Sequence, residues 1–324
     1  MSTVVLVTET EFRRAQSTFT STAGFDCRVV PGGEDPLSEA VVQHGARFVI
    51  VGSSPYRDRL YRTLGTGGVI ARFGVGFDNI DRPKATALGV LCTNTPDVLQ
   101  QSVAEITMTM IGAGARHLLQ AAGSMQRGMW EPREGVELEG KTLALIGTGA
   151  IAQAVARIAA AGFGMRVQGY ARSPRQVPPH FAAICTDFGE AVRGADFVSL
   201  HIPASPENVN FLDAERLALL ERHSWLVNTA RGAVVDEGAL FEALQSRRIA
   251  GAALDVFQRE PYVPVDESRD FRTLDNVVLV PHIGSNTVEA NARMARRALR
   301  NVQLAAAGDL DVMDLINRDV LGAR

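Results

Sequence analysis

The chain has 324 residues and a formal net charge of −3. This balance excludes the strongly basic surface that is typical of nucleic-acid-binding proteins, so no nucleic-acid partner is expected. Hydrophobic residues make up 46% of the chain and charged residues 21%, and these proportions exclude a disordered chain. A chain of this length usually folds as about two domains.

The cysteines and the apolar segments indicate the cellular setting. The three cysteines, Cys27, Cys92 and Cys185, are odd in number and widely spaced, which argues against a disulfide framework or a zinc site. The apolar run near the start meets Glu9 and Glu11 too soon for a signal peptide, and no long uncharged apolar segment follows. We therefore expect a cytoplasmic protein with no membrane span and no metal site.

Apolar segments of strand length alternate with segments of helix length in the first part of the chain. The expected strands are residues 4–7, 29–30, 47–51, 69–73 and 89–92. Because strands that alternate with helices usually pair in parallel, this pattern predicts a mostly parallel sheet. Residues 74–79, GVGFDN, follow one of these strands but lack a third small residue and a continuing helix, so we interpret them as a ligand-facing loop.

A long helix and an irregular connection follow the first unit. The segment 98–119 places apolar residues at spacings of three and four, which predicts an amphipathic helix. We expect this helix to cross between the two domains. Residues 123–140 are rich in glycine and acidic residues, which indicates a projecting connection that is not part of the core.

Residues 142–162, TLALIGTGAIAQAVARIAAAG, are typical of a strand, a tight turn and a helix that follow one another without a gap. In a dinucleotide-binding βαβ unit the first glycine, here Gly147, allows the tight turn, and the second, Gly149, lets the pyrophosphate approach the backbone. The third position must be small, and Ala152 meets that requirement. The N–H groups at the start of the helix would bind the phosphates, so we interpret this stretch as a dinucleotide site.

The remaining segments predict a second sheet and a last helix. Strands are expected at residues 166–170, 197–201, 225–229, 252–255 and 277–280, and the helix at residues 287–307. The predicted fold class is therefore α/β, with two doubly wound, Rossmann-like parallel-sheet domains. If the last helix returns to the first sheet, the first domain is discontinuous and the cofactor domain is inserted into it.

Three charged side chains, Arg231, Glu260 and His282, follow strands of the second sheet, at the edge where parallel sheets bind ligands. Histidine, with a reference pKa of ~6.5, can donate a proton to a carbonyl oxygen, and a neighbouring carboxylate favours its protonated form. A guanidinium can hold a substrate carboxylate through paired hydrogen bonds. Together the three residues indicate hydride transfer beside a nicotinamide, whereas each alone could form an ordinary surface ion pair.

Blocks of residues along nearly the whole chain resemble the D-isomer-specific 2-hydroxyacid dehydrogenase family. The blocks are GVGFDNID (74–81), NTP (94–96), SVAE (102–105), GTGAIA (147–152), LHIP (200–203), NTARGAVVDEGAL (228–240), GAALDVFQREP (251–261) and PHIGSNT (281–287). The resemblance implies an NAD(P)-dependent oxidoreductase in which two lobes close over the substrate. It also implies a homodimer formed partly through residues 105–140.

The resemblance also assigns domains and site residues. It implies a substrate-binding, flavodoxin-like domain at residues 1–100 and 287–324, and an NAD(P)-binding domain at residues 101–286. The implied catalytic residues are Arg231, Glu260 and His282, and the implied substrate-binding residues are Arg72, Val75, Gly76 and Arg231. The implied cofactor-binding residues are Gly147, Gly149, Ala150, Ile151, Arg172, Ser173, Arg175, His201, Pro203, Thr229, Ala230, Asp255, His282 and Gly284. Among these, Asp255 would hold the nicotinamide carboxamide.

Cofactor choice depends on the end of the second strand of the dinucleotide unit. NAD-binding sites usually carry an acidic residue about twenty residues after the glycines, where it binds the ribose 2′-hydroxyl. Between Gly147 and Asp187 this chain has no acidic residue, and Arg172, Ser173 and Arg175 follow the strand instead. These side chains suit a 2′-phosphate, so NADP(H) is the predicted cofactor. A solvated loop that also accepts NAD(H) is the alternative.

These observations predict a reductase that converts a small 2-keto acid, with glyoxylate or hydroxypyruvate first among the candidates, to the D-2-hydroxy acid. His282 would donate the proton. Arg72 could bind a distal charged group of the substrate, so a phosphorylated or dicarboxylic acid is an alternative substrate. The alternative from another class is an NAD(H)-sensing binding protein of the corepressor type, because such proteins share this fold and the same three charged residues.

Overall fold

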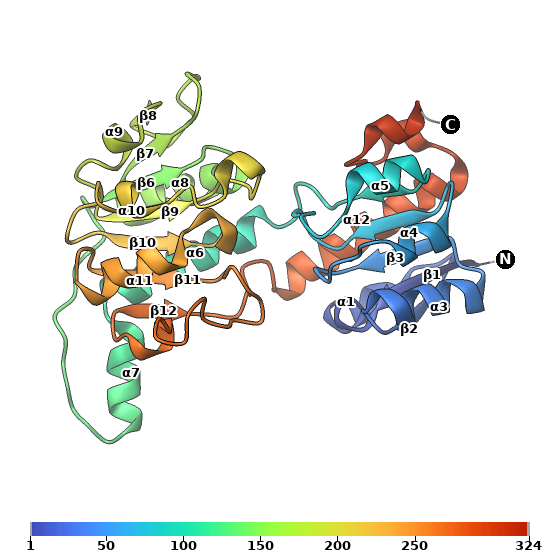
Figure 1. Cartoon of the computed structure of the whole chain (residues 1–324). Helices are drawn as coiled ribbons and strands as arrows, with labels where there is room; N and C mark the ends of the chain where they lie inside the picture. Colours follow the sequence, from blue (N-terminus) through green and yellow to red (C-terminus); the bar gives the residue numbers. More distant parts are fainter. Residues whose placement is uncertain (1, 323–324) are drawn as a thin grey trace. The chain divides into compact units, whose positions relative to one another are not determined.

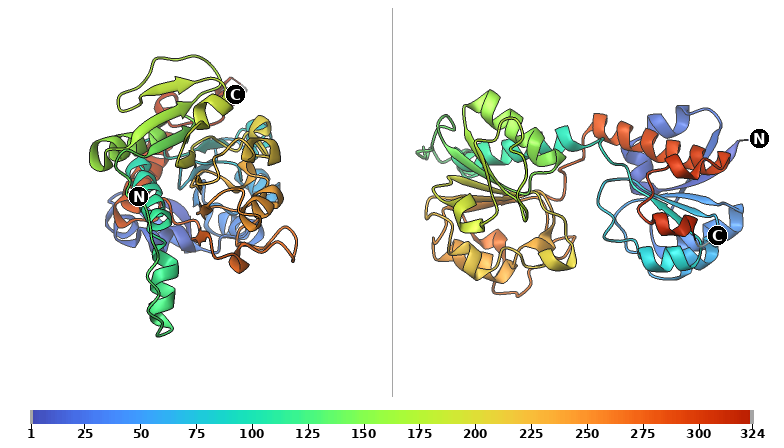
Figure 2. Two further views of the ribbon diagram at one scale, coloured as in Figure 1. Left: turned by 90° about the vertical axis from the view of Figure 1, so that its left-hand side faces the viewer. Right: turned by 90° about the horizontal axis from the view of Figure 1, so that it is seen from above.

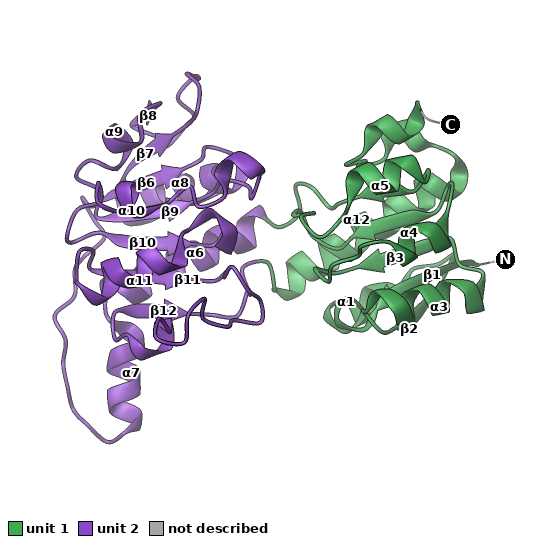
Figure 3. Ribbon diagram, in the orientation of Figure 1, with its two compact units in different colours: residues 1–99, 285–324 green, residues 100–284 purple. Residues whose placement is uncertain are grey.

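The computed structural model describes residues 2–322, which form two compact units (Figure 3). Unit 1 extends to Leu99 and resumes at Ser285, and unit 2 comprises Gln100–Gly284. Each unit has its own purely parallel sheet, so the predicted α/β class with two parallel sheets is confirmed. None of the helices among the described residues is long and apolar enough to cross a membrane.

Unit 1 contains a five-stranded sheet in the order β2-β1-β3-β4-β5 (Figure 1). The strands are β1 (Thr3–Thr8), β2 (Phe25–Val30), β3 (Phe48–Val51), β4 (Val69–Arg72) and β5 (Leu91–Thr93). The helices are α1 (Glu9–Arg14), α2 (Gln16–Ser21), α3 (Glu34–His44), α4 (Arg59–Leu64), α5 (Arg82–Ala87) and α12 (Val288–Ala307). Every neighbouring pair of strands is parallel, because a helix intervenes between successive strands.

The C-terminal part of the chain completes unit 1. Helix α12 packs on the sheet at β4, on the side opposite α4 and α5 (Figure 2, right). Beyond it, the buried side chain of Asn317 accepts a hydrogen bond from Cys92 N at 2.9 Å and donates one to Val90 O at 3.0 Å, so it pairs backbone groups beside the edge strand β5. Arg297 of α12 is held by Asp314 at 2.6 Å, which makes it a structural residue of this unit.

Unit 2 contains a seven-stranded sheet in the order β12-β11-β10-β9-β6-β7-β8. The strands are β6 (Thr142–Ile146), β7 (Arg166–Tyr170), β8 (Ala183–Cys185), β9 (Phe197–Leu200), β10 (Trp225–Asn228), β11 (Gly251–Leu254) and β12 (Val277–Leu279). The helices are α6 (Gln100–Ala115), α7 (Leu118–Gln126), α8 (Ala150–Phe163), α9 (Phe188–Val192), α10 (Ala214–Leu217) and α11 (Glu237–Gln245).

Helices cover both faces of this sheet, as its apolar strands require. Successive residues of a strand point to opposite faces, so Leu143 and Leu145 of β6 pack under α6 and α8, whereas Ala144 and Ile146 join the core with α11. Figure 2 (right) shows this arrangement, with α8 in green on one side and α11 in orange on the other. The unit is therefore a doubly wound sheet.

The structure corrects the prediction of one crossing helix over residues 98–119. Helix α6 begins at Gln100, the first residue of unit 2, and ends at Ala115, so it lies within unit 2 and does not cross between the units. His117, at a φ of +48°, interrupts the predicted helix, and a second helix, α7, extends into the first residues of the expected projecting connection. Figure 1 shows α7 extending away from the sheet of unit 2, followed by a long coil that returns to β6.

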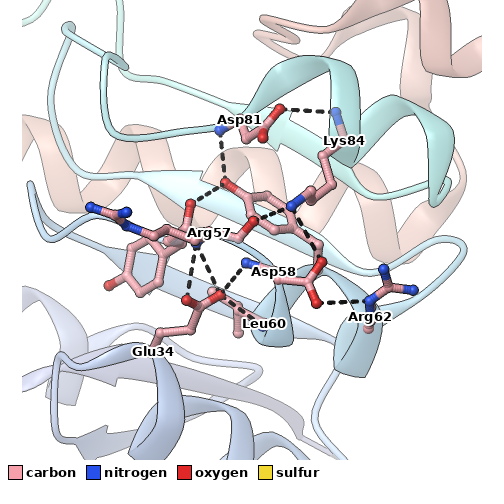
Figure 4. Close-up of polar contacts among 9 residues, drawn as sticks. Glu34, Arg57, Asp58, Leu60, Arg62, Asp81 and Lys84 are labelled. Carbon is pink, nitrogen blue, oxygen red and sulfur yellow. Dashed lines mark hydrogen bonds and ion pairs between the residues drawn. The ribbon is translucent and has the colours of Figure 1, made fainter.

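The side chain of Glu34, at the start of α3, caps the first turn of α4 (Figure 4). Its carboxylate accepts hydrogen bonds from Arg57 N at 3.0 Å, Asp58 N at 2.7 Å and Leu60 N at 3.2 Å. Leu60 lies in the first turn of α4, whose N–H groups have no partner within the helix, and Arg57 and Asp58 directly precede that turn, so one carboxylate accepts from three backbone donors at the start of the helix. This contact joins two helices that cover the same face of the unit 1 sheet.

We expect Glu34→Ala to lower the free energy of unfolding by about 1–2 kcal/mol, because backbone donors at the start of α4 lose their acceptor. Urea denaturation measures the change. The control is Glu39→Ala in the same helix, since Glu39 forms an exposed ion pair with Arg59 and its loss should cost less than about 0.5 kcal/mol. Equal losses in the two variants would contradict the capping role.

Candidate active site

The carboxyl ends of β10, β11 and β12 bring the three predicted catalytic side chains to one edge of the unit 2 sheet. These strands are adjacent, and Arg231, Glu260 and His282 lie in the segments that follow them. Nδ1 of His282 lies 2.6 Å from Oε2 of Glu260, and the side chains are 40% and 33% exposed, so a small molecule can reach both. The positive charge of Arg231 also acts on Glu260.

A glycine brings the arginine segment against the glutamate segment. A Cβ atom added at Gly232 would lie 1.9 Å from the carbonyl carbon of Phe257, a distance that no side chain can occupy. Only glycine therefore allows the backbone after Arg231 to pack directly on residues 257–258. The backbone of this second segment is also held by its own side chain, because Glu260 Oε1 accepts from Phe257 N at 3.0 Å.

Asp255 holds the turn that carries His282. Its buried carboxylate accepts hydrogen bonds from Ile283 N at 2.6 Å and Gly284 N at 2.8 Å, and its carbonyl accepts one from His282 N at 2.8 Å. His282 has a φ of +50°, in the left-handed region that L-residues rarely adopt, so the surrounding contacts must maintain it. The expected contact of Asp255 with a nicotinamide carboxamide stays a prediction.

The electrostatics of the pair keep Glu260 ionised. Burial by itself would raise the pKa of its carboxyl, but the hydrogen bond and the charge of His282, the Phe257 N–H and the charge of Arg231 outweigh burial and lower the pKa. A carboxyl with a lowered pKa stabilises the fold above its ordinary value, and this stabilisation is lost as the pH falls through the folded-state value. At neutral pH His282 therefore faces a carboxylate.

The glycine turn after β6 has the geometry that a dinucleotide pyrophosphate requires. Gly147 has a φ of +102°, and a Cβ there would lie 2.5 Å from the carbonyl oxygen of His201, so the tight turn needs glycine. A Cβ at Gly149 would meet no atom within 4 Å, so open space lies above the start of α8. Ala150 and Ile151 form its first turn, whose N–H groups are available to phosphates.

His201 has an environment opposite to that of His282. Burial lowers its pKa to about 4, and Nε2 lies 2.9 Å from the hydroxyl oxygen of Ser199. It is therefore a neutral imidazole at physiological pH and a poor proton donor. The residues that follow, up to Asn208, form a turn in which Asn208 donates a hydrogen bond to the carbonyl of Pro203 at 2.9 Å.

The predicted phosphate-binding residues lie on the exposed segment after β7. Arg172 Nη1 donates a hydrogen bond to Glu207 Oε1 at 2.9 Å, and Arg175 Nη1 donates one to the hydroxyl of Thr148 at 2.8 Å. Because Thr148 lies between the two glycines of the turn, Arg175 reaches back over the dinucleotide site. Ser173 is exposed between the two arginines.

The other predicted site residues have structural contacts of their own. The hydroxyl of Thr229 lies 3.0 Å from that of Thr107 in α6, and Ala230 N donates to Asn228 Oδ1 at 3.0 Å, so the segment before Arg231 is fixed at both residues. A Cβ at Gly284 would lie 2.8 Å from Oδ2 of Asp255, so a larger residue there would displace this carboxylate.

Three of the four predicted substrate-binding residues, Arg72, Val75 and Gly76, belong to unit 1, whereas Arg231 belongs to unit 2. Arg72 ends β4, and one of its guanidinium nitrogens donates to the carbonyl of Phe73. The loop containing Val75 and Gly76 is held by the carbonyl of Val75, which accepts from Asn94 Nδ2 at 2.7 Å. Asn94, the first residue of the NTP block, thus fixes the backbone of this loop. A loop that presents backbone groups to a ligand must be held in this way.

Two residues near the site, Glu237 and Glu207, were not predicted from the sequence. Glu237 of α11 accepts a hydrogen bond from Gln258 N at 2.6 Å, and burial raises the pKa of its carboxyl despite that bond. Glu207, which follows β9, contacts Arg172. The position of Glu207 after a strand was a usable signal, but Glu237 carries no signal until its partner is known.

Comparisons with known proteins agree with this geometry. Residues 108–284 match the family model of the D-isomer specific 2-hydroxyacid dehydrogenase, NAD binding domain. The glyoxylate reductase of Thermococcus litoralis is 39% identical over 263 residues, which cover 78% of each chain. The D-3-phosphoglycerate dehydrogenase of Methanocaldococcus jannaschii is 41% identical over 246 residues, which cover 75% of this chain and 46% of that protein.

A solved structure extends the likeness to nearly the whole chain. The NADPH-dependent glyoxylate/hydroxypyruvate reductase of Sinorhizobium meliloti, in complex with NADP and malonate, has a TM-score of 0.80 at 28% identity. The likeness covers 94% of this chain and 93% of that chain. The chain therefore belongs to the D-isomer specific 2-hydroxyacid dehydrogenase family, and the resemblance found in the sequence is confirmed. It is an NAD(P)-dependent oxidoreductase of that family.

Proposed function

We propose that this enzyme reduces a small 2-keto acid, glyoxylate or hydroxypyruvate, to the 2-hydroxy acid, of D configuration where it is chiral, with NADPH as the preferred cofactor. The observation that carries the proposal is the 2.6 Å contact between His282 and Glu260 at a sheet edge that also holds Arg231. The names of two similar proteins, a glyoxylate reductase and a glyoxylate/hydroxypyruvate reductase, support the substrate class.

The nicotinamide, when bound beside this edge, supplies a hydride to the carbonyl carbon of the substrate. The guanidinium of Arg231 binds the substrate carboxylate through paired hydrogen bonds and polarises the adjacent carbonyl. Its backbone is oriented by Asn228, whose Nδ2 donates to Arg231 O at 2.9 Å. By holding the carboxylate, Arg231 orients the keto oxygen towards the proton donor.

His282 donates the proton to the carbonyl oxygen as negative charge develops there. Its Nδ1 faces Glu260, so Nε2 is the nitrogen left for the substrate. Glu260 orients the imidazole ring through its contact with Nδ1. General acid catalysis of this kind contributes about 10²- to 10⁴-fold to the rate.

The cofactor preference is supported by the segment after β7. Arg172 and Arg175 place two positive charges beside the glycine turn, where a 2′-phosphate gains charge-assisted hydrogen bonds and a 2′-hydroxyl gains less. The Sinorhizobium meliloti reductase, which is NADPH-dependent by its name, is a structural precedent for this preference.

We expect His282→Gln to reduce the rate of glyoxylate reduction by about 10²- to 10⁴-fold, because glutamine cannot supply a proton. The Kd for NADPH should change by less than about threefold, because the lost group acts in the transition state. Stopped-flow absorbance of NADPH measures turnover, and fluorescence measures binding. Wild-type protein that binds NADPH without turning over any of a panel of 2-keto acids would contradict the proposed reaction.

Arg172→Ala should weaken NADPH binding by about 10- to 100-fold, which corresponds to the loss of one charge-assisted contact of ~1.5–3 kcal/mol. Affinity for NADH should stay nearly constant, because a 2′-hydroxyl does not need the guanidinium. The matched control is Arg193→Ala, which breaks a similar exposed ion pair, with Glu190, on α9. Equal binding of NADPH and NADH by the wild-type enzyme would refute the preference.

We also propose that the enzyme is a homodimer that forms through α7 and the coil after it. This segment exposes large apolar side chains, among them Leu118, Met125 and Trp130, which is 83% exposed. Apolar side chains gathered on one projecting segment are typical of a protein interface.

Light scattering should give wild-type protein twice the 34.8 kDa mass of the chain, and the double variant Met125→Glu, Trp130→Glu should approach the monomer mass. Two charges in an apolar interface would be desolvated without partners, which destabilises the dimer. The control is Val42→Glu, at a valine of unit 1 that is 73% exposed. A wild-type monomer would rule the proposal out.

A further inference from the structure

Two segments on either side of the glycine turn meet through one ion pair. Arg172 follows β7, and Glu207 lies in the short 3-10 turn Pro206–Asn208 that follows β9. In the sheet, β6 lies between β9 and β7, and β6 is the strand that ends in the glycine turn. The Arg172–Glu207 contact, at 2.9 Å, therefore joins the two flanks of the dinucleotide site.

The turn that carries Glu207 has a defined shape. Asn208 is buried, its side chain donates to Pro203 O at 2.9 Å, and its backbone N–H donates to Ser205 O at 2.8 Å. The side chain of Glu207 is 53% exposed and that of Arg172 is 67% exposed, so a pair of this kind contributes little to folding stability. Because the pair lies beside the dinucleotide site, it can affect ligand binding instead of folding stability.

The two arginines after β7 differ in the groups that they contact. Arg175 donates to Thr148, a neutral hydroxyl, whereas Arg172 donates to a carboxylate. A hydrogen bond from its own backbone N–H and the contact with Arg172 lower the pKa of Glu207, so it is ionised at neutral pH. A 2′-phosphate carries about −1.5 to −2 charges, so it would share a guanidinium with another anion and be repelled by it.

We propose that Glu207 is a specificity-determining residue that limits the preference for NADP(H) over NAD(H). It competes with the 2′-phosphate for Arg172, and it supplies from β9 the acidic group that is absent after β7. A carboxylate can accept a hydrogen bond from a ribose 2′-hydroxyl but repels a 2′-phosphate. This inference rests on the proposed role of Arg172 in phosphate binding and deepens it.

Calorimetric titration with 2′,5′-ADP and with 5′-AMP tests the inference without turnover. We expect Glu207→Gln to bind 2′,5′-ADP roughly 3- to 10-fold more tightly than wild type, because one repelling charge is removed. Binding of 5′-AMP should be unchanged or weaker. Because the effect is electrostatic between exposed groups, the gain should shrink at high ionic strength.

Glu190→Gln is the matched control, because Glu190 also forms an exposed pair with an arginine, Arg193, at 2.7 Å, away from the glycine turn. It should leave both affinities unchanged. If Glu207→Gln fails to tighten 2′,5′-ADP while Arg172→Ala weakens it, the inference about Glu207 is wrong and the phosphate contact stands. If Arg172→Ala has no effect on 2′,5′-ADP, the phosphate contact is wrong and the inference falls with it.

Discussion

The buried carboxylate of Asp255 is the contact on which the candidate active site depends. Its two oxygens accept the N–H groups of Ile283 and Gly284, and hydrogen bonds to a charged group contribute about 1.5–3 kcal/mol each. These bonds hold His282 in a left-handed backbone conformation that it would otherwise leave. Burial nevertheless raises the pKa of the Asp255 carboxyl, and the two N–H groups only partly oppose it. The protein thus keeps a costly buried acid where it orients the proposed proton donor.

The two histidines of the site, His201 and His282, have opposite environments. His201 is half-buried beside the glycine turn, and burial lowers its pKa to about 4, whereas His282 faces a carboxylate that the pair itself helps to keep ionised. The same side chain is therefore a neutral imidazole in one place and the proposed proton donor in the other, a contrast of environments that is common at enzyme sites. Glycines at 147 and 232 allow this by bringing backbone segments closer than any side chain would permit.

Sequence patterns predicted the elements that depend on local composition. Strand ends, the glycine turn and the three charged residues follow from apolar runs and from the rule that ligands bind beyond parallel strands. The break at His117 was not predictable, because apolar spacing continues through a residue whose φ is positive. Strand β8 was missed because its three residues are only half-buried, and half-burial leaves little pattern. The contacts of Asp255 and Glu237 could not be predicted either, since their partners lie on other segments.

The same limit applies to rules for cofactor choice that consider one strand at a time. The sequence after β7 carries two arginines and no acid, so a rule based on that strand predicts a site suited only to phosphate. In the folded chain the neighbouring segment after β9 brings Glu207 to Arg172, so the net charge around Arg172 is lower than the β7 segment indicates. Because electrostatic energy sums over all nearby charges, the proposed cofactor selectivity depends on the two segments together. An acid inserted after β9 can moderate a basic segment after β7 without any change in the glycine turn.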